Sequence, residues 1–160
     1  MESGTIKVAD KDGVYVIKMI GDVRLTLCVS FDTYINQLFD KDDFKAIFFN
    51  LNQAQAIDST TLGLMAKISL RGKERKGIQP TIVSNSASIN RLLDCMGFSQ
   101  IFNIATNDDS VLCPDVSLAE SELDEDVVRQ KVLEAHRILM DLNEDNSSKF
   151  RDLVTALEIQ

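Results

Sequence analysis

Strand-like and helix-like segments alternate along the first two thirds of this sequence, and this alternation restricts the fold more than any other feature. Residues 14–20, 46–51 and 80–83 are short apolar segments typical of strands, and stretches with apolar residues at helical spacing lie between and after them. Such an order is typical of α/β folds, whose parallel strands are joined by right-handed helical crossovers. The sequence therefore predicts a mixed, mainly parallel sheet with functional groups at the carboxyl ends of its strands.

The N-terminal part of the sheet is predicted to begin with a hairpin. Residues 6–9 and 14–20 flank Asp12-Gly13, a dipeptide that favours a tight two-residue turn. Apolar and polar residues then alternate over 25–29, which predicts a short strand, and Ser30 is predicted to cap the helix that follows.

Three helices and three further strands are predicted between residues 31 and 104. The continuous apolar run in 46–51 predicts a central strand covered on both faces, with the polar stretch 52–55 leading out of it. Residues 98–104 predict a last strand at a sheet edge. The three apolar stripes that predict the helices consist of Phe31, Tyr34, Ile35, Leu38 and Phe39; Leu62, Met65, Ala66 and Leu70; and Ile89, Leu92, Leu93 and Met96.

A short polar cluster, Asp58-Ser59-Thr60-Thr61, lies between the central strand and the second of these helices. Unpaired backbone N–H groups and the helix dipole both favour negative charge at a helix start, so a phosphate on Ser59 would be accommodated without unfolding the helix. Ordinary N-capping explains the same residue types, so the cluster alone leaves both interpretations open.

The chain changes character beyond Thr106. Polar and acidic residues predict a linker and a helix start over 107–126, and two amphipathic helices follow, one over about 128–142 and one after Asn146-Ser147-Ser148. We therefore predict a domain at residues 1–110 and a C-terminal helical extension at residues 111–160. Its helices either fold back onto the domain, as amphipathic stripes usually do, or bind a partner.

Composition points to a protein partner and away from several other classes. With 25 acidic against 17 basic residues, the net charge of −8 disfavours nucleic-acid and anionic-membrane binding. The N-terminus has no signal-peptide pattern and no long apolar run is present, so we expect a cytoplasmic protein. Three scattered cysteines indicate neither a disulfide framework nor a metal site, and no cofactor is expected.

The sequence gives little support for catalysis. His136 is the only histidine and is distant in sequence from Ser59, so a Ser-His-Asp triad is not expected. We expect His136 to be a solvated residue on its helix. Neither GxxxxGK[ST] nor GxGxxG occurs, which leaves nucleotide chemistry of those types without support.

Residues 5 to 106 together resemble the STAS domain of anti-sigma factor antagonists. The resemblance is carried by the Gly21-Asp22 turn, the strand 47–51, the Asp58-Ser59 loop that opens a helix with Leu62-Gly63, and the closing segment 96–102. It implies that a partner anti-sigma kinase phosphorylates Ser59, that a cognate serine phosphatase reverses this, and that only the unphosphorylated form binds the anti-sigma factor. Asp58 would support the loop. The family motif usually reads Asp-Ser-Ser-Gly-Leu, so Thr60 is an alternative acceptor here.

A partner-docking surface is expected on the second helix, at Ser59, Thr60, Gly63, Leu64, Lys67 and Ile68. Leu64 and Ile68 lie one turn apart and off the predicted core stripe, although partial burial would explain them equally well. Two other functions stay open: a constitutive scaffold or assembly subunit that uses the C-terminal helices for protein contacts, and a small-molecule binder or enzyme that uses Ser59.

Overall fold

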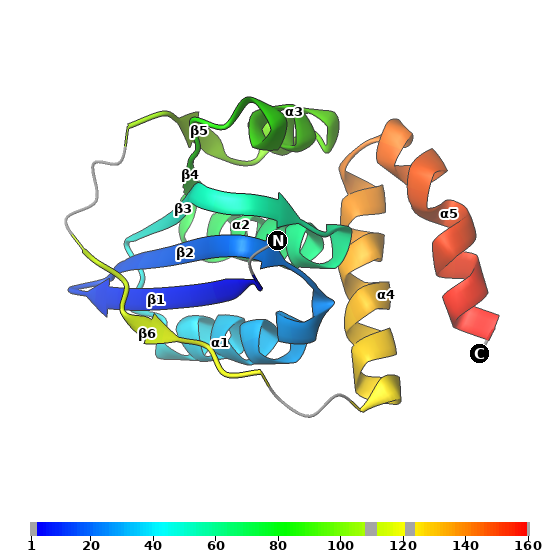
Figure 1. Cartoon of the computed structure of the whole chain (residues 1–160), viewed down its shortest axis with the longest axis horizontal. Coiled ribbons are helices and arrows are strands. Elements are labelled where there is room, and N and C mark those ends of the chain that lie inside the picture. Colours follow the sequence, from blue (N-terminus) through cyan, green and yellow to red (C-terminus); the bar gives the residue numbers. More distant parts are fainter. Residues whose placement is uncertain (1–2, 108–111, 121–123, 160) are drawn as a thin grey trace.

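The protein forms a six-stranded sheet with its helices on one face. The computed structural model describes residues 3–107, 112–120 and 124–159. The strands are β1 (Thr5–Lys11), β2 (Val14–Val23), β3 (Ala46–Ile57), β4 (Thr81–Val83), β5 (Asn103–Ala105) and β6 (Val116–Ser117). They lie in the order β5-β4-β3-β2-β1-β6, and the pairs from β2 to β5 are parallel (Figure 1). The predicted fold class is confirmed.

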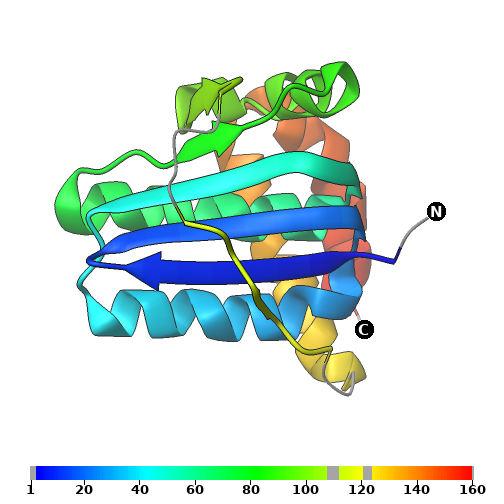
Figure 2. The same cartoon turned by 60° about the vertical axis from the view of Figure 1, so that its left-hand side comes forward.

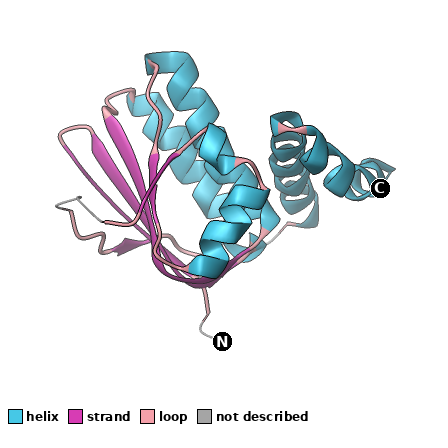
Figure 3. Cartoon of the chain, turned by 90° about the horizontal axis from the view of Figure 1, so that it is seen from above, coloured by secondary structure: helices cyan, strands magenta, loops and turns pink. Residues whose placement is uncertain are grey.

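The helices are α1 (Cys28–Lys41), α2 (Ser59–Lys76), α3 (Ala87–Cys95), α4 (Glu125–Leu142) and α5 (Glu144–Ile159). Figure 3 shows them on one side of the sheet, with α4 and α5 standing beyond the others. On β3, Ile47, Phe49 and Leu51 are buried toward the helices, whereas Phe48 and Asn50 on the opposite face are only half-buried. The prediction that this strand is covered on both faces is therefore wrong.

The N-terminal hairpin forms as predicted. Asp12 and Gly13 both have positive φ, 53° and 84°, which is the backbone of a type I′ turn. The central strand is longer than predicted, because residues 52–55 continue β3 instead of leaving it and pair with the end of β2 across two register shifts. β3 thereby reaches Ile57, one residue before the polar cluster.

Residues 25–29 do not form the predicted strand. Leu25–Leu27 is a 3-10 turn and α1 begins at Cys28, so Ser30 lies inside the helix instead of capping it. The Ser30 hydroxyl donates to the backbone carbonyl of Ala119. A strand would place Leu25 and Leu27 on the same face. In the structure Leu27 is buried and Leu25 is exposed, which a tight helical turn allows.

The predicted strand 98–104 is mostly wrong in type but correct in position. Phe98–Gln100 is a 3-10 turn, and only Asn103–Ala105 forms β5, at the edge of the sheet. Phe98 and Phe102 are both buried with ring centroids 5.0 Å apart. In a strand these two side chains would share a face but lie about 13 Å apart. Their contact at 5.0 Å needs a helical turn, and this packing overrides the strand pattern.

The C-terminal segment returns to the domain. β6 pairs antiparallel with β1 at the sheet edge opposite β5 (Figure 2). The sequence pattern did not predict β6. α5 begins at Glu144, so Asn146-Ser147-Ser148 lies inside the helix and not before it. Residues beyond 110 thus contribute both to the sheet and to the packing of the helices, and the division at residue 110 stays a prediction.

Candidate functional site

The polar cluster opens α2 at the carboxyl end of the central strand. Asp58 is the N-cap of α2, and its Oδ1 accepts from the backbone N–H of Thr61 at 2.9 Å. Its Oδ2 accepts from the backbone N–H of Leu25 at 2.7 Å. One carboxylate therefore holds both the helix start and the neighbouring 3-10 turn, and this fixes the position of Ser59.

Ser59 is half-buried, and a histidine lies directly against its hydroxyl. Ser59 Oγ is 2.7 Å from Nε2 of His136 on α4, and Nδ1 of that ring is 2.7 Å from the backbone carbonyl oxygen of Val132. Because a carbonyl oxygen only accepts, Nδ1 carries a hydrogen. A neutral ring with its hydrogen on Nδ1 leaves Nε2 to accept from the Ser59 hydroxyl.

His136 is not the solvated residue that the sequence led us to expect. It is 2% exposed, and it packs edge-on against the Phe150 ring of α5 at 5.0 Å between ring centroids. The pair differs from a catalytic triad in its third member: Nδ1 faces a backbone carbonyl in place of a carboxylate. The contact joins residues 77 apart in the sequence, so no local signal would have revealed it.

The residues expected to form a docking surface are covered in this structure. Thr60, Gly63, Leu64, Lys67 and Ile68 are all buried, and Leu64 and Ile68 are 0% exposed members of the hydrophobic core. The expectation that these two side chains lie off the core is wrong. α2 packs against the sheet on one side and α4 on another, so its buried surface is wider than its apolar stripe.

Gly63 is the point of closest approach between α2 and α4. A Cβ built on Gly63 would lie 2.3 Å from the carbonyl oxygen of Ala135 and 2.6 Å from the Ala135 Cβ. Real Cβ atoms do not approach this closely, so any side chain here would require α4 to move. The absence of a side chain at this position lets the two helix backbones touch.

A cluster of charged groups joins α4 to both α1 and α2. Lys67 donates from Nζ to Asp32 Oδ1 at 2.7 Å and to Glu134 Oε1 at 2.6 Å, and Lys131 donates to Asp32 Oδ2 at 2.6 Å. Burial acts to raise the pKa of Asp32, but the hydrogen bonds from Lys131 and Lys67 outweigh it and hold that pKa below its usual value. The hydrogen bond to Asp32 raises the pKa of Lys131. Asp32 and Lys131 are therefore both ionised at neutral pH.

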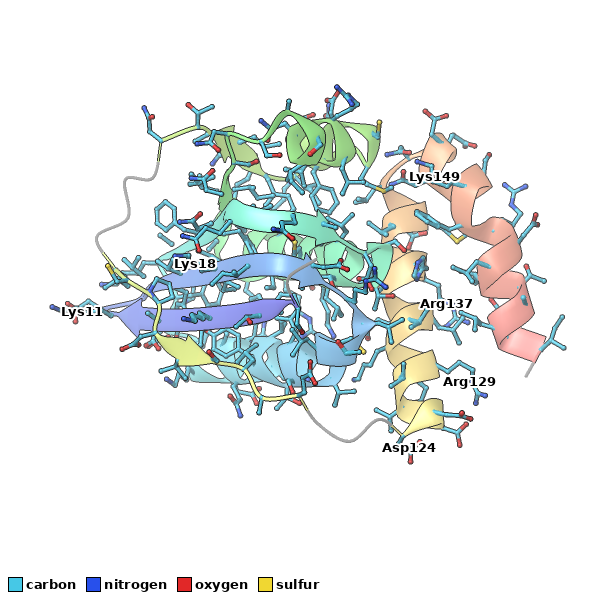
Figure 4. All side chains as sticks on the ribbon, in the orientation of Figure 1. Lys11, Lys18, Asp124, Arg129, Arg137 and Lys149 are labelled. Carbon is cyan, nitrogen blue, oxygen red and sulfur yellow. The ribbon has the colours of Figure 1, made fainter. Side chains whose placement is uncertain are left out.

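The turn between α4 and α5 is attached to the end of α3. The side-chain amide of Asn146 donates to the carbonyls of Met96 and Leu139, each at 2.9 Å. Asn143 donates to the Met96 carbonyl at 3.4 Å. Figure 4 shows Arg137 between α4 and α5, where it pairs with Glu158 at 3.3 Å. These contacts make α4 and α5 one hairpin that lies against the domain.

An open depression of about 540 Å³ lies beside Asp58 at the strand ends, and Asp22, Arg24 and Thr26 contribute to its lining. Arg24 pairs with Asp22 at 2.7 Å across it. Within the described ranges, no group of three or more His, Cys, Asp or Glu residues is placed to hold a metal ion. Across the same residues, no helix combines the length and apolar character needed to cross a bilayer.

The fold and the site define an α/β domain in which a capped helix, opening with a serine, follows the central strand of a mainly parallel sheet. Residues 5–111, about two thirds of the chain, match the STAS domain, and the chain belongs to this family. The match ends before β6, so α4 and α5 lie outside it. None of the curated proteins compared with the chain is similar enough to count as a match.

Solved structures of anti-sigma factor antagonists share the fold. One from Mycobacterium paratuberculosis is 20% identical, with a TM-score of 0.56 over 67% of this chain and 89% of its own. The antagonist SpoIIAA in its unphosphorylated form is 13% identical, with a TM-score of 0.54 over 65% of this chain and 90% of its own. The Bacillus cell fate determinant SpoIIAA in its phosphorylated form is 16% identical, with a TM-score of 0.52 over 64% and 92%. At these identities the likeness establishes the fold alone.

Proposed function

We propose that this protein is an anti-sigma factor antagonist that acts as a phosphorylation-controlled partner switch and has no catalytic activity of its own. In its unphosphorylated form it binds an anti-sigma factor or a related regulator, and phosphorylation of Ser59 releases that partner. The observation that carries the proposal is the place of Ser59, the first residue of α2, capped by Asp58 at the end of the central strand of a STAS fold.

The chemistry of this position suits such a switch. A phosphoryl group adds about −1.5 to −2 charges and three acceptor oxygens. At the start of α2 the backbone N–H groups tolerate it, so the fold survives. In a protein interface beside the Asp58 carboxylate, the same charge is desolvated and repelled, at a cost of several kcal/mol when it stays unpaired. A penalty of about 3 kcal/mol weakens binding about a hundredfold.

Ser59 is a better acceptor than Thr60. Ser59 is half-buried, whereas Thr60 is 3% exposed and faces the interior. The partners are then an anti-sigma factor that acts as a serine kinase, and a serine phosphatase. We assign docking to the surface around Ser59, Gly63 and Lys67, and the net charge of −8 favours a protein partner over nucleic acid or membrane.

Mass spectrometry of the protein isolated from its own host, with peptide mapping, tests the modification directly. We expect a gain of one phosphate on the peptide that contains Ser59. The switch is tested with Ser59→Asp and Ser59→Ala as affinity baits, and with Ser88→Asp as a matched control, because Ser88 is an exposed residue in the first turn of α3.

Ser59→Asp should lose the partner that wild type, Ser59→Ala and Ser88→Asp all retain. Two results count against the proposal: a peptide that carries no phosphate under any growth condition, and equal capture of the same partner by both Ser59 variants.

A scaffold function has one observation in its favour, which is the outer face of α5. Leu153 is 42% exposed and Ile159 is 80% exposed there. If this face is the main contact, Leu153→Glu should abolish assembly and the Ser59 variants should leave it unchanged. If the protein is a switch, Leu153→Glu should leave capture of the partner unchanged and Ser59→Asp should abolish it.

A further inference from the structure

Helix α4 lies across the first three turns of α2, where the proposed partner would dock. Ser59, Gly63 and Lys67 follow one another by a single turn along α2, and they meet His136, Ala135 and Glu134, which are consecutive on α4. A step of one residue along α4 thus matches a step of one full turn along α2. The two helices therefore cross at a steep angle. Figure 1 shows this crossing, with α4 running across the strand ends.

The contacts of α4 with α2 have the character of an interface between two separable parts. They include one hydroxyl to imidazole hydrogen bond, one close backbone approach and one lysine to carboxylate pair, beside apolar packing in which Ala135 and Leu139 of α4 are 0% exposed members of the hydrophobic core. The Glu134 side chain is 43% exposed, so water reaches this end of the contact. Withdrawal of α4 leaves the groups at Ser59, Gly63 and Lys67 open to water or to another protein, whereas the apolar contacts of Ala135 and Leu139 have to be replaced by those of the partner.

A phosphate on Ser59 in its present rotamer and α4 in its present place exclude each other. The Ser59 oxygen lies within 2.7 Å of the His136 ring nitrogen, so the space between them holds one hydrogen and no phosphorus with its three further oxygens. A kinase likewise needs the hydroxyl free, and a partner that docks on α2 needs the surface that Ala135 occupies.

We propose that the α4–α5 hairpin is a displaceable internal cover of α2, which competes with both the protein partner and the phosphate for the surface around Ser59. In taking that surface as the docking site the inference rests on the proposed function. It extends that function by a third state, in which the chain is unphosphorylated and still closed to its partner. The partner that fits presents a helix with a small residue opposite Gly63 and a carboxylate opposite Lys67, as α4 does.

The turn at Asn143 and Asn146 is the natural pivot for this movement. Both side chains bind the Met96 carbonyl at the end of α3, at a distance from the Ser59 contact along α4. The hydrogen bonds of this turn need not break when the opposite end of α4 swings away from α2.

The cover can be tested without knowledge of the partner, with a fluorescein-labelled synthetic peptide of residues 124–159 as the probe. Ala135→Leu in the full chain places a larger side chain against Gly63 and forces α4 off α2 without changing α2 itself. Gln130→Leu, on an exposed position of α4, is the matched control. We expect hydrogen exchange across residues 59–67 to rise at least tenfold in Ala135→Leu and to stay unchanged in the control.

Fluorescence anisotropy should show that the Ala135→Leu protein binds the peptide at least tenfold more tightly than wild type or the control does. The full chain carrying phosphoserine at position 59 should exchange as fast as Ala135→Leu over residues 59–67, and it should not bind the peptide. Glu134→Lys, with the exposed Asp141→Lys as its control, gives a milder opening should Ala135→Leu fail to fold.

Unchanged exchange over residues 59–67 in a folded Ala135→Leu or Glu134→Lys protein would overturn the proposal, and so would equal peptide binding by wild type and variant. The proposed function fails separately, on the mass of the native protein and on the Ser59 baits. If Ala135→Leu binds the peptide more tightly than wild type but the native protein carries no phosphate, α4 covers a surface whose function is not the proposed switch.

Discussion

Gly63→Ala is the substitution that most directly measures how α4 sits on α2. Replacing a glycine in a helix interior with alanine ordinarily stabilises the helix by about 1 kcal/mol. Gly72, in the same helix α2, provides the control, because a Cβ there would meet Ile78 Cγ1 at 3.2 Å, a side-chain atom that can move aside. We expect Gly72→Ala to range from neutral to stabilising by about 1 kcal/mol.

The structure gives a different result for Gly63. Its new Cβ would lie 2.3 Å from the backbone oxygen of Ala135, and that atom must retreat by at least 0.7 Å to pass 3.0 Å. Overpacking of this kind costs about 1–3 kcal/mol. After the helix-propensity gain of about 1 kcal/mol, Gly63→Ala should be destabilised by up to about 2 kcal/mol, and the two variants should differ by about 1–2 kcal/mol.

Urea unfolding with linear extrapolation measures the free energy of unfolding of both variants, and hydrogen exchange of α4 detects relief of the clash by local lifting of this helix. A Gly63→Ala protein that matches Gly72→Ala in stability and in the exchange of α4 would refute the close approach of the two helices.

The remaining predictions concern buried ionisable groups. Asp32→Asn should lower the free energy of unfolding by about 3 kcal/mol, because it leaves the ammonium groups of Lys67 and Lys131 without their shared carboxylate, whereas Arg137→Ala, at an exposed pair, should cost less than about 1 kcal/mol in the same urea titration. Because the pKa of Asp32 is depressed in the folded state, its stabilisation is complete above about pH 4 and is lost as the pH falls through the folded-state pKa. Urea midpoints from pH 7 to pH 2 should therefore fall less in Asp32→Asn than in wild type, and equal losses would contradict this assignment. Burial raises the pKa of Cys28 to about 11, so a maleimide at pH 7 should label the two exposed cysteines of the native protein and the third only in denaturant; three labels on the native chain would contradict its burial.

Elements with local signals were predictable from the sequence. The Asp12-Gly13 turn has a dipeptide that suits positive φ at both positions, and α2 has a capping aspartate at its start and a glycine at its end. Residues 98–104 were mispredicted because their structure depends on the burial of Phe98 and Phe102 against a core that the local sequence does not specify.

The site was predictable at Asp58 and Ser59, and its cover was not. An amphipathic stripe on α4 indicates that the helix packs somewhere, but it does not specify which surface receives it. The meeting of His136 with Ser59 and the burial of Lys67 both depend on that choice. Sequence separation, more than composition, limited what could be foreseen.

The short strand β6 sets how far the hairpin can travel. It pairs with β1, and the carbonyl of the nearby Ala119 accepts a hydrogen bond from Ser30, so the chain is fastened five residues before Asp124, the N-cap of α4. A helix tethered by so short a linker stays at an effective concentration on the order of millimolar around α2. A partner helix with the same intrinsic affinity for α2 would have to reach that concentration to occupy α2 in half of the molecules. The number of residues between β6 and α4 thus sets how abundant, or how tightly binding, a partner must be to displace α4.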